Sequence, residues 1–331
     1  MFLAISVLIN IGGMFNGLGE VSGAHRHGGP RMDEIVVQDG SGSDKIVVVP
    51  IEGIITSRAG DHGPYNMVEI VKEQLERAEN DDDVKAVVLR VDSPGGEVLA
   101  SDDIANEIRR FQDDSSKPVV VSMGSLAASG GYYVAAPCEW IVANELTITG
   151  SIGVIMHGFN YRGLMNKIGL KPEVYKSGKF KDMLSGDREP EQISPEEREM
   201  VQKLIDETYG KFKQVVGDGR KAAHDVNKDG RALVKNWADF ADGRVFSGKE
   251  AKELGFVDEL GGFQTAVDRA EKLAGIKGSA EVVEYRQRLD FADLFGIWGN
   301  SEAKVVKVDI GLDAPKLQAG RMYFITPTVL P

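Results

Sequence analysis

Apolar and polar residues alternate along this chain in blocks that predict strands separated by helices. The segments 45–51 and 84–91 are rich in valine, isoleucine, alanine and leucine, a pattern typical of strands buried on both faces. Between them, Asn66 followed by Glu69 forms a capping-box signature, and a further helix is predicted over 102–111. This order favours right-handed crossovers and an α/β fold with a mainly parallel sheet.

The second half of the chain carries fewer but clear signals. Ser194 followed by proline and two glutamates predicts the start of a helix that runs to about residue 216. Beyond it, strands are expected at 282–285 and 322–325, with an amphipathic stretch over 291–298.

These patterns divide the chain into four parts. Residues 1–15 are apolar but shorter than the roughly 20 residues that span a bilayer, and no lysine or arginine precedes them. Their hydropathy favours a short or truncated membrane anchor over a buried or disordered tail. Residues 16–43 are expected to be a linker, 44–277 the main folded domain, and 278–331 a C-terminal extension.

Composition narrows the class of protein. The 331 residues are 42% hydrophobic and 27% charged, enough to bury a large core in one large or two modest domains. A net charge of −12 and the lack of a basic stripe argue against a nucleic-acid partner. The single cysteine excludes a disulfide framework, and no cluster has the spacing of metal ligands, so no cofactor is expected.

Ser129 lies in the most informative motif of the chain. Two alanines precede it and two glycines follow it, between an apolar strand at 118–121 and a helix-compatible stretch at 132–136. A strand–turn–helix context of this kind exposes a nucleophilic serine beside backbone amide donors. The same run is also compatible with a close-packed turn that carries an ordinary hydroxyl.

A second glycine turn strengthens the nucleophile interpretation. The predicted strand over 84–91 ends in Asp-Ser-Pro-Gly-Gly at 92–96, a turn that can direct bare backbone amides into a cleft. Acyl transfer usually needs two such donors for the oxyanion, each worth about 3–4 kcal/mol of the barrier. The amides of Gly96 and Gly130 are the candidates.

The histidines do not supply an obvious base for Ser129. Four of the five lie in loop-like or polar helical sequence, and His157, which follows an apolar segment, is more simply structural. Cys138 has apolar or bulky neighbours and is expected to be a buried core residue.

A lysine is therefore the best remaining base. The loop over 175–183 contains three lysines, and Lys181 has Phe180 and Met183 close by, which favours its burial. A lysine acts as a base only when neutral, and desolvation can lower its pKa from about 10.4 by several units. The alternative is a solvated basic loop, since runs of charge are usually exposed.

Five segments together resemble a known family. They are, in chain order, 92–96 (Asp-Ser-Pro-Gly-Gly), 124–133 (Gly-Ser-Leu-Ala-Ala-Ser-Gly-Gly-Tyr-Tyr), 149–154 (Thr-Gly-Ser-Ile-Gly-Val), 176–182 (Lys-Ser-Gly-Lys-Phe-Lys-Asp) and 243–261. The chain resembles signal peptide peptidase A, the protease IV type of Ser-Lys peptidase, in its short single-copy form, over about residues 45–275. The resemblance implies a fold similar to Clp protease and crotonase, so that residues 44–277 form the catalytic domain.

The resemblance also implies roles for individual residues. Ser129 matches the nucleophile and Lys181 the general base, while Gly96 and Gly130 match the oxyanion donors. Ser151 falls where a hydroxyl is expected to orient the lysine amine.

At the level of the whole protein, the resemblance implies a homo-oligomer in which neighbouring subunits supply the serine and the lysine of each site. It also implies an N-terminal membrane anchor, a catalytic domain outside the cytoplasm, and substrates that are short apolar peptides such as remnants of signal peptides.

Two other classes of function stay open at this point. One is a crotonase-type acyl-CoA enzyme, which shares the glycine-lined oxyanion turns but needs no serine beside a lysine. The other is an inactive scaffold that keeps the fold for the assembly of membrane complexes.

Overall fold

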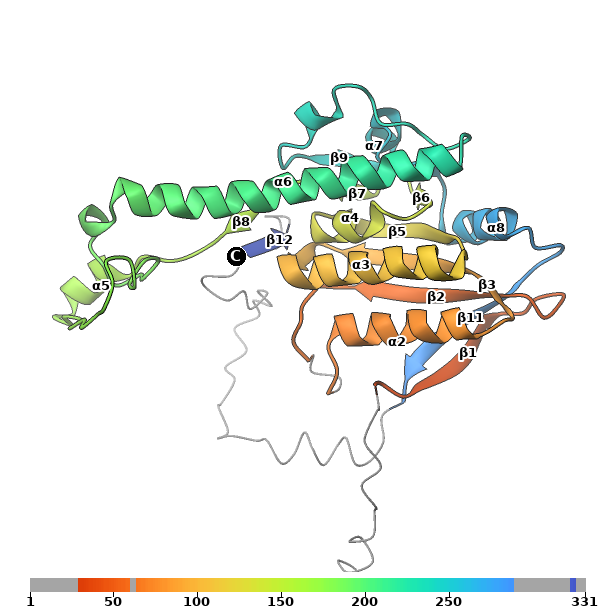
Figure 1. The fold of residues 1–331 in the computed structure, drawn as a ribbon, viewed down its shortest axis with the longest axis horizontal. Helices are drawn as coiled ribbons and strands as arrows, with labels where there is room; N and C mark the ends of the chain where they lie inside the picture. The colour runs from red at the N-terminus through yellow and green to blue at the C-terminus, as the bar shows by residue number, and fades with distance from the viewer. Residues whose placement is uncertain (1–28, 60–63, 289–321, 326–331) are drawn as a thin grey trace, which may run out of the picture.

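A nine-stranded sheet lies at the centre of the computed structural model, which describes residues 29–59, 64–288 and 322–325 (Figure 1). The main path of the sheet runs, in order, through β1 (Met32–Gln38), β11 (Glu281–Gln287), β2 (Lys45–Glu52), β3 (Val84–Ser93), β5 (Val119–Ala128), β6 (Trp140–Ala143) and β10 (Glu259–Leu260). Neighbours from β11 to β10 are parallel, and only β1 on this path is antiparallel to its neighbour. The α/β fold with a mainly parallel sheet is therefore confirmed.

Helices cover both faces of the sheet and explain why its strands are apolar throughout. Val47 and Val49 of β2 belong to the larger core, whereas Ile46 and Val48 of the same strand belong to a second core on the opposite face. Successive side chains of a strand point to opposite faces, so a strand with two buried faces needs apolar residues at nearly every position. The helices packed on the sheet are α2 (Met67–Asn80), α3 (Val98–Ser115), α4 (Gly130–Ala135), α7 (Gly248–Leu254) and α8 (Phe263–Ala274).

The predicted capping box begins α2. The Glu69 amide donates to Asn66 Oδ1 at 3.1 Å, and the Asn66 amide donates to Glu69 Oε2 at 2.9 Å. These two bonds satisfy amides that the first turn of a helix leaves unpaired. The helix predicted over 102–111 is also present, as part of the longer α3.

Helix α6 (Pro195–Val226) starts where the sequence predicts but continues beyond residue 216. Gly217 and Gly219 favour an end to the helix at that point, yet both lie within it. A Cβ atom on Gly219 would lie 2.6 Å from the Ala136 carbonyl oxygen. The glycine therefore permits a close approach of α6 to the end of α4.

Two strands of the main sheet, β1 and β11, lie outside the predicted boundaries of the main domain. Strand β1 lies inside the segment 16–43 that was expected to be a linker, and β11 lies inside the expected extension 278–331. The two strands pair with each other, and β11 also pairs with β2. Because this pairing joins segments that lie far apart in the chain, local sequence pattern does not reveal it. The predicted anchor over 1–15 and the stretch 291–298 lie outside the described residues.

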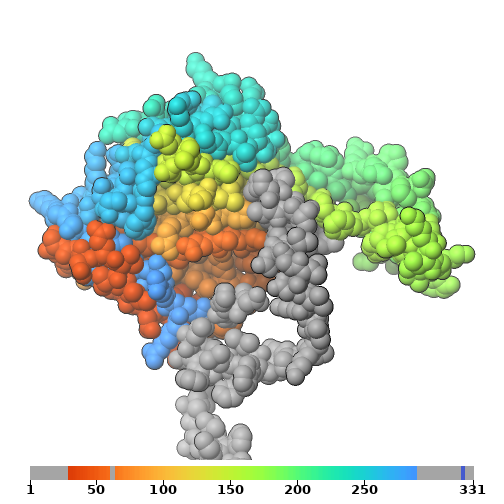
Figure 2. Space-filling view, turned by 180° about the vertical axis from the view of Figure 1, so that it is seen from behind, coloured from red at the N-terminus to blue at the C-terminus, as the bar shows by residue number. Residues whose placement is uncertain are grey.

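The remaining elements form a small second sheet and a projecting arm. The small sheet has the order β4 (Gly95–Glu97), β12 (Met322–Ile325) and β8 (Ile155–Met156). The arm, defined here as residues 157–211, contains α5 (Arg162–Lys167), a short 3-10 helix (Pro190–Gln192) and the first half of α6. It projects from the body in both views (Figures 1 and 2), and its last residues, Thr208 and Tyr209 among them, contact the body. The other connections contain β7 (Ile148–Gly150), β9 (Val245–Ser247) and a second 3-10 helix (Trp237–Phe240). No helix in the described part of the chain is long and apolar enough to cross a membrane.

Candidate active site

Ser129 occupies the tight turn between β5 and α4, in the predicted strand–turn–helix context. Its backbone has φ 55° and ψ −116°, a left-handed conformation that is strained for any residue except glycine. The Ser129 amide donates to the Gly150 carbonyl at 2.8 Å, and the Ser129 carbonyl accepts from the Tyr133 amide at 2.8 Å. Both ends of the turn are therefore held in place, and the residue is 1% exposed.

The two glycine turns lie directly against each other beside Ser129. A Cβ atom on Gly130 would lie 2.7 Å from Ser101 Oγ and 3.0 Å from the Gly96 amide nitrogen. A Cβ atom on Gly95, whose φ is 98°, would lie 2.6 Å from the Gly130 amide nitrogen. The backbone amides of Gly96 and Gly130 are thus neighbours, an arrangement that suits two donors to one oxyanion.

An extended segment of the chain lies along this turn. Strand β12 pairs antiparallel with β4, with Phe324 opposite Gly96. The Phe324 carbonyl oxygen is 1.9 Å from the position of a Cβ atom on Gly95, which places this oxygen close to the Gly130 amide. The edge of β4 therefore accepts a peptide strand whose carbonyl lies beside the candidate oxyanion donors.

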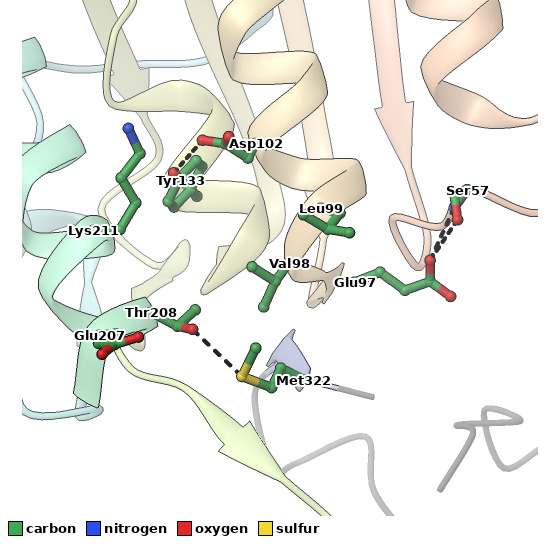
Figure 3. Close-up of a pocket in the computed structure, with 10 residues that line it drawn as sticks. All are labelled: Ser57, Glu97, Val98, Leu99, Asp102, Tyr133, Glu207, Thr208, Lys211 and Met322. Atoms are coloured by element: carbon green, nitrogen blue, oxygen red, sulfur yellow. Dashed lines mark hydrogen bonds between the residues drawn. The ribbon is translucent and has the colours of Figure 1, made fainter. Parts of the chain in front are cut away.

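Aromatic side chains pack against Phe324, the residue opposite Gly96. The Phe324 ring stacks on Tyr133 at 4.8 Å between centroids and contacts Phe212 of α6 at 4.7 Å. The Tyr133 hydroxyl donates to Asp102 at 2.6 Å (Figure 3). Burial, and then the bond to Asp102, raise the pKa of the Tyr133 phenol, so its hydroxyl remains a donor.

A mostly apolar cavity of about 690 Å³ lies next to these rings. Met322 of β12 lines it and contacts the Thr208 hydroxyl of α6, as Figure 3 shows. On the far side, the Glu97 carboxylate accepts a 2.7 Å hydrogen bond from the Ser57 hydroxyl. The cavity is large enough for an apolar side chain of an extended peptide.

Ser151 lies close to Ser129. The preceding residue, Gly150, accepts the amide hydrogen bond of Ser129, and Ser151 itself is 4% exposed with φ 51°. Its amide donates to the Arg244 carbonyl at 2.7 Å. Ser151 therefore directly follows the residue that accepts the amide hydrogen bond of Ser129.

Lys181 lies on the arm, and no described contact joins it to Ser129. The residue is exposed, which matches the solvated loop that the sequence left open as the alternative to a buried lysine. The two other lysines of the loop are paired: Lys176 with Asp182 and Lys179 with Glu196, each at 2.6 Å. Within the described residues Lys181 has no carboxylate partner, and it is therefore the lysine of the three whose amine is free to act elsewhere.

The other titratable candidates do not contact Ser129 in the described structure. His157 packs edge-to-face with Phe159 on the arm, and His224 Nδ1 is 3.1 Å from the Gly230 carbonyl oxygen. Cys138 is buried, and burial raises the pKa of its thiol, so it is a core residue as predicted.

Comparisons with known proteins identify the family of this chain. Peptidase family S49 matches residues 111–277. The chain belongs to peptidase family S49. It is 44% identical over 191 residues to a protein of Synechocystis named as a protease, covering 58% of this chain and 64% of that protein. It is 36% identical over 264 residues to a protein of Enterococcus faecium named as a signal peptide peptidase SppA, covering 78% of this chain and 72% of that protein.

Among solved structures, a mutant of the 1510-N membrane-bound stomatin-specific protease covers 74% of this chain and 99% of its own, with a TM-score of 0.44 and 16% identity. The family and its named relatives support a serine peptidase, as the sequence predicted.

The sequence did not reveal three parts of this site. They are the pairing of β12 with β4, the contact between Phe212 and Phe324, and the bond between Tyr133 and Asp102. The available signals were the strand predicted at 322–325 and the tyrosine pair directly after the serine motif. Their partners lie on other elements and could not be named from spacing.

Proposed function

We propose that this S49 peptidase is an endopeptidase with a Ser-Lys dyad that cleaves short apolar peptides held in extended form. The observation that carries the proposal is the pairing of β12 along β4, beside Ser129 and Gly130. An edge strand binds an extended segment mainly through backbone hydrogen bonds. Such binding depends on few of the side chains, so it suits peptides of varied sequence. The apolar cavity and the aromatic rings next to it favour apolar side chains.

In the proposed reaction, the Ser129 oxygen attacks the peptide carbonyl carbon while its proton passes to the neutral amine of Lys181. The amides of Gly96 and Gly130 hold the oxyanion. When the C–N bond breaks, the lysine ammonium gives its proton to the leaving amine, and an ester remains on Ser129. Lys181 then takes a proton from water, whose oxygen attacks the ester carbon. When the C–O bond to Ser129 breaks, the lysine ammonium returns this proton to the Ser129 oxygen, and the carboxylic acid product leaves. Since the amine must be neutral, activity should rise toward alkaline pH.

We further propose that Lys181 reaches Ser129 of a neighbouring copy. The arm extends away from the body and exposes apolar side chains that its own copy does not cover: Phe159, Leu164, Ile168, Leu170, Val174 and Tyr175. Exposed apolar patches rimmed by polar residues mark interaction sites, and a second copy would cover them. Ser151 would then bind the incoming amine beside Ser129.

The substrates that we propose are remnants of signal peptides, which the name of the Enterococcus faecium relative suggests. Such peptides are apolar and arise at the membrane, so an N-terminal anchor with an extracytoplasmic catalytic domain fits this substrate. Fractionation of a full-length fluorescent fusion tests the anchor, and recovery of all fluorescence in the soluble fraction would contradict it.

The first experiment is labelling of the assembled full chain with a fluorophosphonate probe, followed by location of the adduct by mass spectrometry. We expect an adduct on Ser129 that is lost in Ser129→Ala and weakened in Lys181→Ala. The absence of any adduct on a folded, assembled protein would favour the scaffold or the acyl-CoA enzyme. Binding of an acyl-CoA would then identify the latter.

A mixing experiment tests whether the site is shared. Ser129→Ala and Lys181→Ala subunits are each expected to be inactive alone. If the serine and lysine come from different copies, unfolding and refolding the two together should restore about a quarter of the sites. A mixture that stays inactive while assembling normally would show that each copy builds its own site.

A further inference from the structure

Lys181 sits on a tight turn at the far end of the arm. Three backbone hydrogen bonds close this turn: Lys181 N to Gly178 O at 3.4 Å, Met183 N to Phe180 O at 3.0 Å, and Ser185 N to Asp182 O at 3.1 Å. Leu184 ends the turn with φ 68°, a conformation that bulky residues rarely adopt. A strained backbone of this kind persists only where surrounding contacts hold it.

Arg188 contacts this turn at Asp182, which also pairs with Lys176. The Arg188 Nη1 atom lies 3.4 Å from the Asp182 carbonyl oxygen, and its Nε atom lies 3.6 Å from the Asp182 carboxylate. The same Nη1 atom lies 3.0 Å from both carboxylate oxygens of Glu197, and Nη2 donates to the Gln192 carbonyl. One guanidinium therefore joins the residue next to Lys181 to the start of α6.

Glu197 is itself fixed to the helix. It lies in the first turn of α6, and its backbone amide donates a 3.2 Å hydrogen bond to the hydroxyl oxygen of Ser194, the N-cap residue. The other half of α6 is buried in the body through residues that include Phe212 and Arg220. A rigid helix thus runs from the core to the contact with Arg188, and this contact sets where the Lys181 turn stands relative to the core.

Burial distinguishes this contact from the other ion pairs of the arm. The Arg188 and Glu197 side chains are 12% and 5% exposed, whereas those of Lys179 and Glu196 are 69% and 57% exposed. A buried ion pair is weak evidence for stability, because desolvation of both charges opposes their attraction. Hydrogen bonds to an ionised carboxylate do, however, fix geometry. A role in orientation accounts for a buried pair on an element that is otherwise exposed.

We infer that Arg188 is a positioning residue, which fixes the Lys181 turn to α6 through Asp182 and Glu197 and so sets where the lysine amine is delivered. The inference rests on the proposed function of Lys181. Arg188 touches neither substrate nor Ser129 in the described structure, so it acts only through the turn.

The test compares Arg188→Ala, Arg188→Lys and Glu197→Gln with the matched control Lys179→Ala, in the assembled full chain. Two quantities are measured: hydrogen–deuterium exchange of residues 178–185, and kcat and KM on an apolar peptide. Arg188→Ala should speed exchange in this turn and lower kcat on the order of 100-fold, as a misplacement of about 1 Å does. KM should stay within about twofold, because the peptide site is on the body.

In Arg188→Lys and Glu197→Gln, the exchange rate of residues 178–185 and kcat should fall between the values of wild type and Arg188→Ala. In Lys179→Ala, the exchange rate and the kinetic constants should match those of wild type. Unchanged exchange in Arg188→Ala, or an unchanged kcat, would overturn the inference. A general loss of protection throughout the body would also overturn it, since Arg188 would then be a folding residue. Full activity in Lys181→Ala would refute the proposed function instead, and the exchange data would still decide whether Arg188 holds the turn.

Discussion

Ser129 combines a left-handed backbone with almost complete burial. At such a φ, glycine is the residue that fits without strain, so the serine is retained at the expense of stability. Strain of this kind is typical of residues whose side chain has a chemical role.

We therefore predict that Ser129→Gly is more stable than Ser129→Ala, by about 1 kcal/mol in the free energy of unfolding. Both variants lack the hydroxyl, and only glycine relieves the strained φ. Urea unfolding followed by tryptophan fluorescence measures the difference. Ser122, in the preceding strand β5 with an ordinary φ, supplies the control pair, in which alanine should be the more stable. An equal or greater stability of Ser129→Ala would contradict the interpretation of strain.

Glu139 provides a test of pH dependence. Burial raises the pKa of its carboxyl, although a 3.4 Å hydrogen bond from Asn227 lowers it in part. As pH rises through the ordinary range near 4.3, the unfolded chain loses this proton first, and the folded protein then binds more protons. Stability therefore falls as pH rises until the folded carboxyl has also ionised.

The Glu139→Gln variant should not show this fall in stability with rising pH, because its side chain does not ionise. The variant should match wild type at low pH and become more stable than wild type as pH rises above the ordinary range of a glutamate. Denaturant midpoints across pH 3–8 measure the trend, which the exposed Glu145→Gln should not show. A constant difference between Glu139→Gln and wild type at every pH would refute the assignment.

At the scale of elements, α6 lies in two environments: its first half is on the arm and its second half is in the body. Its second half is anchored by Arg220, which is fully buried and donates to the Asp258 carboxylate and, at 3.0 Å, to the Cys138 carbonyl. Asp258 also accepts from the amides of Ile141 and Arg231, at 2.8 and 2.9 Å. The ion pair of Arg220 and Asp258 therefore connects α6 to β6 and to the loop that contains Arg231.

Removal of the Arg220 guanidinium should leave a buried carboxylate without its counter-charge. We expect Arg220→Ala to lower the free energy of unfolding by about 3–5 kcal/mol. Lys228→Ala, which breaks the exposed pair with Asp225, should lower it by less than about 1 kcal/mol. Chemical denaturation of both variants makes the comparison, and similar losses in the two would argue against Arg220 as the anchor.

At the scale of the whole molecule, the body and the arm divide the proposed site. Ser129, Gly96, Gly130 and Ser151 lie together in the body, whereas Lys181 lies on the arm. Under the proposed mechanism, a single copy would hold only one member of the dyad at each site, and activity would depend on assembly.

Polar substitutions on the arm should consequently reduce assembly and activity together. Leu164 and Ile168 are 62% and 67% exposed in one copy, so their replacement by aspartate does not disturb its core. We expect the double variant Leu164→Asp and Ile168→Asp to sediment as a smaller species and to lose turnover in proportion. Val226→Asp, at the far end of α6 and 70% exposed, is the control. An assembled but inactive double variant, or an active monomer, would separate the two properties and contradict the prediction.

By itself, the sequence determined the class of fold, the strand–turn–helix around Ser129 and the second glycine turn. These features are local: burial on two faces, a capping box and a tight turn each need particular residues within a few positions. The lysine loop was identified from its three lysines and the lack of a histidine base, and then from the resemblance to a family.

Only the tertiary structure decided which distant segments meet. The pairing of β1 with β11, the seating of β12 on β4, and the joining of Asp182 to Glu197 by Arg188 all depend on contacts between separate parts of the chain. The exposure of Lys181 was decided in the same way, because its environment is set by where α6 carries the arm. The periodicity of hydrophobic residues indicates how many faces of a helix or strand are buried. It does not indicate which other element covers those faces.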